Sequence, residues 1–219
     1  MFADRQEAGN LLGDKVKKEL GIDEGVVLGI TRGGVIVAQR VADKLGFPLD
    51  IIVIKKIGAP GNPELAIGAV GPQETIFWDE RFTGETGVDE QYKTACVKEK
   101  KSELAAQESK LRSGKLPISL AEKDVCLVDD GVATGTTVLC AREYLIKKKA
   151  KRIILAVPVI AEDTMKQFAK QFDRIITLRV EKNFAAVGQF YRDFPQVTDE
   201  EVIDLINKMN LSEKVKTKS

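Results

Sequence analysis

Short apolar runs alternate along the chain with segments whose apolar residues recur at helical spacing. Residues 5–20 place their apolar side chains on one helix face, which predicts a first amphipathic helix. Strands are predicted where four or five mainly apolar residues follow one another, a pattern typical of parallel strands covered on both faces. The predicted strands are 26–30, 51–54, 125–128, 153–157 and 175–178, and further helices are expected at 35–45, 136–148 and 163–170.

This repetition of strand and helix predicts the fold class. Successive β-α-β units form α/β folds in which helices cover both faces of one sheet, and 219 residues suffice for one substantial core. We therefore expect a doubly wound α/β domain with a mostly parallel five-stranded sheet and a small hood or lid, over residues 1–211. Residues 212–219 alternate lysines with polar residues, so a disordered tail is expected there.

Two segments do not fit the repeat. Residues 57–73 are rich in glycine and proline, which predicts a functional loop, a mobile lid or a small hairpin. Residues 89–113 are highly charged and carry few apolar side chains. This pattern favours a largely solvated surface helix or a helix that packs on a partner.

The charge balance and the cysteines limit the partners and the compartment. With 34 Lys and Arg against 33 Asp and Glu, the net charge of +1 gives no overall field for nucleic acid. No apolar run approaches the ~20 residues that span a bilayer, so no membrane partner is expected. Three widely spaced cysteines fit no disulfide framework, and a cytoplasmic location is the simplest expectation.

The chain contains no histidine. Its absence excludes Ser-His-Asp and Cys-His nucleophile systems and nearly all His-based metal sites. Any chemistry must therefore use carboxylates, Lys and Arg, hydroxyls and the backbone.

The strongest chemical motif lies at the carboxyl end of the predicted strand 125–128. Two consecutive carboxylates, Asp129 and Asp130, follow the strand, and a loop rich in glycine and threonine then opens a helix. Backbone N–H groups of such a loop can cradle a phosphate at the helix N-terminus. Because carboxylates repel an anion, the acid pair requires a ligand part with hydroxyl donors, such as a ribose diol. The motif therefore indicates a ribose 5-phosphate unit.

Two other interpretations of this motif are weaker. The aspartates could merely cap the following helix, but two acids with Thr-Gly-Thr-Thr in so short a span disfavour that interpretation. The Walker pattern and the G-x-G-x-x-G dinucleotide fingerprint do not occur in the sequence.

Residues 128–137, Val-Asp-Asp-Gly-Val-Ala-Thr-Gly-Thr-Thr, resemble the donor-binding signature of type I phosphoribosyltransferases. Segments 2–9, 32–35, 56–69 and 184–194 resemble a bacterial and archaeal branch of predicted phosphoribosyltransferases with unassigned acceptors. The resemblance implies a phosphoribosyl pyrophosphate donor, Mg²⁺ held mainly by the donor and water rather than by direct protein ligands, a small-molecule acceptor and a homodimer.

The resemblance also assigns candidate site residues. The donor 5-phosphate is expected at Ala133, Thr134, Gly135, Thr136 and Thr137. Pyrophosphate is expected at a turn with small residues and a basic fork after the first strand, and at a lysine after the second: Thr31, Arg32, Gly33, Gly34 and Lys56. For Lys56, a solvated surface lysine without a role in binding is nearly as good an interpretation as pyrophosphate binding. The catalytic candidates are Arg32, Asp129, Asp130 and Glu64.

Position 133 bears on the acceptor. Enzymes for 6-oxopurines carry an aspartate there, whereas this chain has Ala133, which disfavours a hypoxanthine or guanine acceptor. Glu64 is then the best remaining carboxylate for acid–base chemistry, although an exposed loop glutamate is the plainer interpretation.

The acceptor is expected beside the hood segment, defined here as residues 181–195. Phe184 and Val187 follow the last predicted strand, in a stretch that resembles the base-contacting segment of purine phosphoribosyltransferases. Phe184 is predicted to stack on a flat base, whereas Phe190, Tyr191 and Phe194 are assigned to packing. The alternative is that all four aromatic residues form a core or dimer-contact cluster.

These observations predict transfer of ribose 5-phosphate from phosphoribosyl pyrophosphate to a nitrogenous base or similar acceptor, with release of pyrophosphate. The transition state should be loose, so electrostatic stabilisation is needed more than a covalent nucleophile. The alternative is a non-catalytic regulatory protein that senses phosphoribosyl pyrophosphate or a nucleotide.

Overall fold

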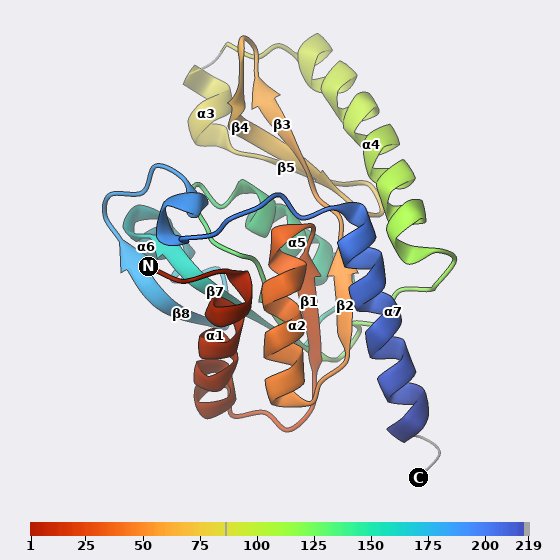
Figure 1. Ribbon diagram of the computed structural model, residues 1–219. Coiled ribbons are helices and arrows are strands. Elements are labelled where there is room, and N and C mark those ends of the chain that lie inside the picture. The colour runs from red at the N-terminus through yellow and green to blue at the C-terminus, as the bar shows by residue number, and fades with distance from the viewer. Residues whose placement is uncertain (86, 217–219) are drawn as a thin grey trace.

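A five-stranded parallel sheet forms the centre of the molecule in the computed structural model, which describes residues 1–85 and 87–216. Its strands are β1 (Val26–Ile30), β2 (Leu49–Ile52), β6 (Asp124–Val128), β7 (Arg152–Ala161) and β8 (Arg174–Glu181). They lie in the order β2-β1-β6-β7-β8, and each neighbouring pair is parallel (Figure 1). The predicted five-stranded α/β class is confirmed.

Helices cover both faces of this sheet because its strands are apolar on both sides. The helices of the domain body are α1 (Arg5–Glu19), α2 (Gly33–Leu45), α5 (Thr136–Lys147) and α6 (Glu162–Phe168). Val26 and Leu28 of β1 pack in one cluster with α5, while Val27 packs in another with α1 and α2. The sheet is therefore buried between two helical layers, as continuous apolar strands require.

The second strand begins and ends two residues earlier than predicted, at Leu49–Ile52 instead of 51–54. Val53 and Ile54 are buried but lie beyond the strand, where the chain leaves the central sheet. Asp50 can lie inside the strand because its carboxylate accepts hydrogen bonds from Arg112, from the backbone N–H of Ile51 and from that of Ile118. A buried charge with such partners is tolerated in a strand.

Residues 57–73 belong to a separate antiparallel sheet of three strands, called the small sheet here. It consists of β3 (Lys55–Ala59), β4 (Asn62–Gly71) and β5 (Thr75–Trp78), and α3 (Glu80–Glu85) follows it. The small sheet stands above the carboxyl end of the central sheet in Figure 1. The glycine- and proline-rich segment thus forms a hairpin, and its movement over the site stays a prediction.

The charged segment 89–113 is α4 (Glu90–Arg112), a surface helix in which Leu104 and Leu111 are the buried residues, as expected of a largely solvated helix. Leu104 and Leu111 are buried in an apolar cluster shared with the small sheet and with α7 (Asp199–Lys216). In Figure 1 the α4 ribbon runs beside the small sheet and reaches α7. A few apolar side chains suffice to pack α4 on the domain because they lie on a single face of the helix.

Residues 212–216 were expected to be disordered, but they continue α7, since Glu and Lys favour helix. Residues 217–219 lie outside the described residues.

Truncation of Leu111 tests the packing of α4. Leu111→Ala should lower the free energy of unfolding by about 2–5 kcal/mol, because the side chain is 1% exposed and its loss leaves a cavity. Leu116→Ala is the matched control, since Leu116 is 90% exposed. Denaturant titration measures both variants. Equal and small effects would contradict the burial of this face of α4.

Candidate active site

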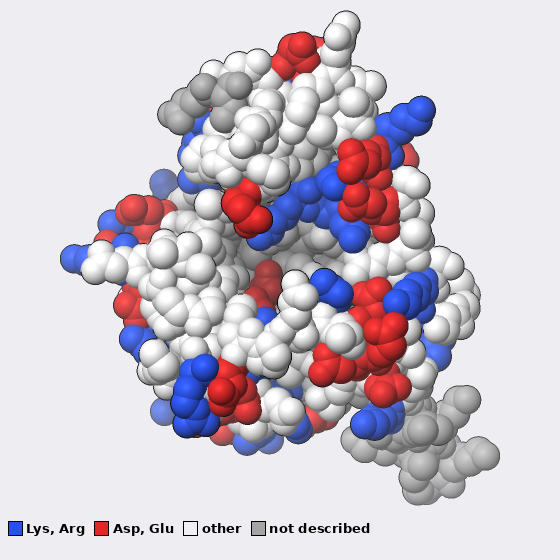
Figure 2. Space-filling view, turned by 45° about the horizontal axis from the view of Figure 1, so that its top comes forward, with Lys and Arg blue, Asp and Glu red and all other residues white. Residues whose placement is uncertain are grey.

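A cavity of about 420 Å³ opens at the carboxyl ends of β1, β2 and β6, between the central sheet and the small sheet. Ligands of open α/β sheets bind at this edge. In Figure 2 the surface is hollowed here, beneath the lobe formed by the small sheet. The lining combines the predicted turn after β1, the start of β3, the acid pair and the loop after it: Thr31, Arg32, Gly33, Lys55, Lys56, Asp129, Asp130, Ala133, Thr134, Gly135, Thr137 and Val187, with Ile30, Ile54, Gly131 and Val132.

The two carboxylates after β6 lie at the floor of this cavity. Asp129 Oδ1 accepts a hydrogen bond of 2.9 Å from the backbone N–H of Asp130. Asp130 Oδ2 accepts one of 2.7 Å from Arg5 Nε, and the Asp130 carbonyl accepts one of 2.5 Å from the Tyr191 hydroxyl. The Asp130 side chain is 14% exposed. Both acids are therefore held in fixed positions with little water around them.

Burial sets the electrostatics of the acid pair. Desolvation raises the pKa of Asp129 well above its ordinary value, and the adjacent charge of Asp130 raises it further. Desolvation also raises the pKa of Asp130, while the Arg5 guanidinium opposes that rise. A ligand that donates hydrogen bonds to the ionised pair would relieve this cost, which is the property expected of a ribose diol.

Arg5 is a site residue that sequence reasoning missed. Its Nη1 donates a hydrogen bond of 2.8 Å to the Pro195 carbonyl, and its guanidinium lies 3.6 Å from the centre of the Phe194 ring. It thereby joins the first turn of α1, the acid pair and the hood segment. Arg5 and Asp130 are 125 positions apart in the sequence, so no local spacing could reveal the contact.

The turn after β1 approaches the acid pair so closely that it requires glycine. A Cβ atom on Gly33 would lie 1.9 Å from Asp130 Oδ2 and 2.8 Å from Arg5 Nε. The Thr31–Arg32 peptide bond is cis. Arg32 lines the cavity, and its Nη1 lies 3.8 Å from Asp199 Oδ1 at the start of α7. The predicted pyrophosphate turn and the acid pair therefore form one continuous wall.

Cations form the wall opposite the acid pair. Lys55 and Lys56 begin β3 and line the cavity, whereas Arg32 belongs to the turn beside the acid pair. Lys and Arg side chains gather along the upper wall of the hollow in Figure 2. The charge of Lys56 acts on the floor of the cavity, where it lowers the pKa of both aspartates against the effect of burial. The cavity therefore has one anionic end and one cationic end.

The loop that follows the acid pair, residues 131–137, is called the donor loop here. Thr134, Gly135 and Thr137 line the cavity, while Thr136 is buried and begins α5. Gly135 precedes the helix with a left-handed backbone, φ 82°, which favours glycine. The loop thus presents its backbone at the N-terminus of α5, where an anion is stabilised.

Of three further candidates predicted from the sequence, one lines the cavity and two do not. Val187 lines the cavity and lies close to Gly131, whose Cβ would be 2.6 Å from a Val187 methyl group. Phe184 packs on Phe190 with ring centres 4.8 Å apart. Among the described residues, those lining the cavity do not include Phe184 or Glu64, which is exposed on β4. The geometry favours a packing role for Phe184. Glu64 does not lie among the described residues that line the cavity.

The acid pair, the glycine- and threonine-rich loop at the N-terminus of α5 and cationic side chains line one cavity at the carboxyl end of the central α/β sheet. The model of the phosphoribosyl transferase domain family matches residues 4–195, and the chain belongs to that family.

The chain is also similar to individual bacterial proteins, one of them with a solved structure. The crystal structure of TT1426 from Thermus thermophilus is 36% identical, with a TM-score of 0.80, and the match covers 95% of this chain and 98% of that one. "Putative phosphoribosyl transferase Rv0571c" of Mycobacterium tuberculosis (strain ATCC 25618 / H37Rv) is 36% identical over 95% of this chain. This chain spans 47% of that relative. "Bifunctional protein PyrR" of Ligilactobacillus salivarius (strain UCC118) is 29% identical over 66% of this chain and 63% of its own length.

Within the part of the chain that the structure describes, no helix combines the length and the apolar character needed to cross a membrane.

The raised pKa of Asp129 predicts a pH dependence of stability. Between the ordinary value of 3.8 and its raised pKa, the native carboxyl binds more protons than the unfolded one, so the free energy of unfolding falls as pH rises. Asp129→Asn should flatten this fall and raise stability at neutral pH. Thermal unfolding at a series of pH values from 3.8 upward measures the slope.

Asp124→Asn provides a control of opposite sign. Its hydrogen bond with Arg152 lowers the pKa of Asp124, so its carboxylate adds stability above 3.8 that is lost as pH falls. The Asn variant should lose stability at neutral pH. If Asp129→Asn behaved like Asp124→Asn, the acid pair would not carry the electrostatic cost described here.

Proposed function

We propose that the chain transfers ribose 5-phosphate from phosphoribosyl pyrophosphate to a nitrogenous base or similar small acceptor and releases pyrophosphate. The observation that carries this proposal is the arrangement of the cavity. The acid pair, the donor loop, Arg32 and Lys56 line the same cavity, and the turn that carries Arg32 adjoins the acid pair. A donor that carries a monophosphate, a diol and a pyrophosphate offers a partner for each of these groups.

Each part of the lining has a role in this reaction. Asp129 and Asp130 accept hydrogen bonds from the ribose hydroxyls, and the amides and hydroxyls of residues 133–137 bind the 5-phosphate. The bond between the anomeric carbon and pyrophosphate breaks as a bond from the acceptor forms, and the sugar carries positive charge in between. The buried acid pair stabilises that positive charge, while Arg32 and Lys56 stabilise the negative charge of the leaving group.

The donor set suits magnesium. Mg²⁺ prefers carboxylate and phosphate oxygens and keeps several waters, and two carboxylates line the cavity. Asp129 and Asp130 would reach the ion through water or ribose oxygens. When bound, the ion would neutralise charge on the pyrophosphate.

Replacement of one carboxylate tests the ribose assignment. Asp130→Asn should weaken binding of the magnesium complex of phosphoribosyl pyrophosphate by roughly 10- to 150-fold, because a hydrogen bond to a charged group contributes about 1.5–3 kcal/mol. Isothermal titration calorimetry measures the dissociation constant. Asp163→Asn, on an exposed side chain of α6, is the control and should bind normally. Unchanged constants for both Asp129→Asn and Asp130→Asn would refute the ribose assignment.

The acceptor position is tested by two truncations. Val187→Ala should raise the Michaelis constant for the acceptor several-fold, since Val187 lines the cavity beside Gly131. Phe184→Ala should instead lower the melting temperature with little change in that constant, because Phe184 packs on Phe190. The reverse pattern would restore the stacking role predicted from the sequence.

Transfer itself is measured by pyrophosphate release from the donor with a panel of nitrogenous bases. Release that depends on one base supports the transferase. Tight donor binding without release for any base would favour the regulatory alternative.

A further inference from the structure

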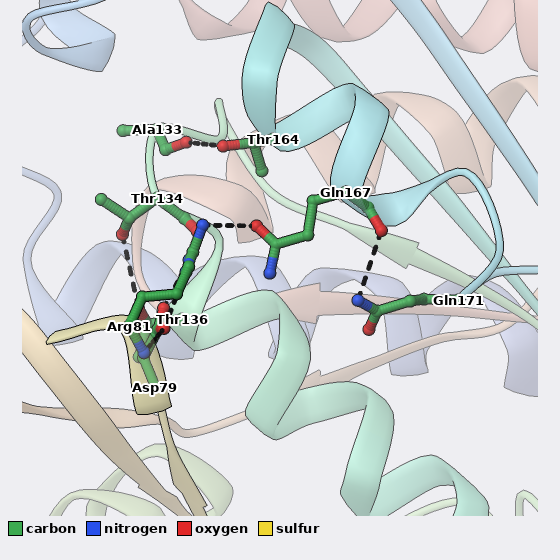
Figure 3. A network of polar contacts seen from close by, with 8 residues as sticks. All are labelled: Asp79, Arg81, Ala133, Thr134, Thr136, Thr164, Gln167 and Gln171. Carbon is green, nitrogen blue, oxygen red and sulfur yellow. Dashed lines mark hydrogen bonds and ion pairs between the residues drawn. The ribbon is translucent and has the colours of Figure 1, made fainter. Parts of the chain in front are cut away.

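The outer side of the donor loop, which faces away from the cavity, is held by groups from two other elements. The Ala133 carbonyl accepts a hydrogen bond from the Thr164 hydroxyl of α6. The Thr134 carbonyl accepts one of 3.4 Å from Nη2 of Arg81, which follows the small sheet. Figure 3 shows the contact between Ala133 and Thr164 and labels Arg81 and Thr134, whose hydrogen bond joins the next position of the loop. Two successive carbonyls of the loop therefore have donors outside the cavity.

Arg81 is itself fixed by a buried carboxylate. Its Nε and Nη2 donate to the two carboxylate oxygens of Asp79 at 2.8 and 2.5 Å, and Asp79 is 3% exposed. The backbone N–H of Asp79 donates to the Ile67 carbonyl of β4 at 2.9 Å. The guanidinium is thus attached to the small sheet, and its position follows the position of that sheet.

The same guanidinium also reaches α6. Arg81 Nη1 donates a hydrogen bond of 2.6 Å to Gln167 Oε1, as Figure 3 shows. The ring of Phe168, the residue after Gln167, lies so close to the loop that a Cβ on Gly135 would be 2.2 Å from it. Arg81, Thr164 and Phe168 therefore enclose the outer side of the donor loop, from the small sheet on one side and from α6 on the other.

A phosphate cradle needs its N–H groups turned inward, and its carbonyls must then find donors on the outer side. We infer that Arg81 and Thr164 are positioning residues that hold the donor loop in its phosphate-binding shape. The inference rests on the proposed function of that loop. It also means that binding of the 5-phosphate and the placement of the small sheet are coupled through Arg81.

Two substitutions test the inference without touching the cavity lining. Arg81→Gln removes the contacts to Asp79 and Thr134, and Thr164→Val removes one hydroxyl at nearly constant volume. Each should weaken binding of ribose 5-phosphate by roughly 5- to 10-fold, the effect of one lost hydrogen bond. Binding of magnesium pyrophosphate, which the opposite wall receives, should change less than twofold. Calorimetry measures both ligands on the full chain.

Arg152→Gln is a matched control for the loss of an arginine pair. Arg152 binds Asp124 through Nε and Nη2 at 2.8 and 2.6 Å, and the side chains are 43% and 7% exposed, against 48% and 4% for Arg81 and Asp79. This pair lies at the start of β6 and β7, the opposite edge of the sheet. Arg152→Gln should lower the melting temperature about as much as Arg81→Gln but leave both ligand affinities unchanged.

The outcomes separate the inference from the proposed function. Selective loss of ribose 5-phosphate affinity in Arg81→Gln and Thr164→Val supports it. Unchanged ribose 5-phosphate affinity in both variants, or equal weakening of the two ligands, overturns it while the proposed function stands. If the unsubstituted chain binds neither ligand, the proposed function fails and the inference fails with it.

Discussion

Burial of two adjacent carboxylates at the end of β6 is the constraint around which the site is built. Removing charge from water is costly unless partners compensate it. Arg5 supplies the nearest opposite charge, and Gly33 leaves room for the contact. The N-terminal residues and the hood segment are paired by backbone hydrogen bonds, from Phe2 N to the Phe190 carbonyl and from Arg192 N to the Phe2 carbonyl. Distant parts of the chain therefore meet at Asp130.

The proposed reaction would use charges contributed by both sheets. The central sheet carries the acid pair and the donor loop, while the small sheet contributes Lys55 and Lys56 from the opposite side. A transition state with a positive sugar and a negative leaving group gains from fixed charges of both signs that need not reorganise. The arrangement requires no histidine, in agreement with a chain that has none.

The central sheet and the donor loop could be predicted because their signals are local. Each strand is a short apolar run, and the acid pair and donor loop are consecutive in the sequence. The small sheet was harder to predict, because glycine and proline in residues 57–73 are typical of loops. Its strands are defined by pairing with each other and by the apolar face of α4, neither of which a single segment reveals.

The missed site residues share one physical reason. Arg5 and Arg81 act through tertiary contacts with Asp130 and Thr134, and an arginine that pairs over such distances has the same local sequence as a solvated one. In the hood segment, too, tertiary contacts decide which side chain lies at the cavity. Phe184 has the right chemistry for stacking on a base, but the fold turns it toward Phe190 and leaves Val187 at the cavity.

A crystal structure of the chain with ribose 5-phosphate would test the arrangement most directly. The phosphate should lie on the backbone amides of residues 133–137, with both ribose hydroxyls within hydrogen-bond distance of Asp129 and Asp130. A phosphate bound instead between Arg32 and Lys56, with the acid pair free of the sugar, would contradict the assignment of the two ends of the cavity.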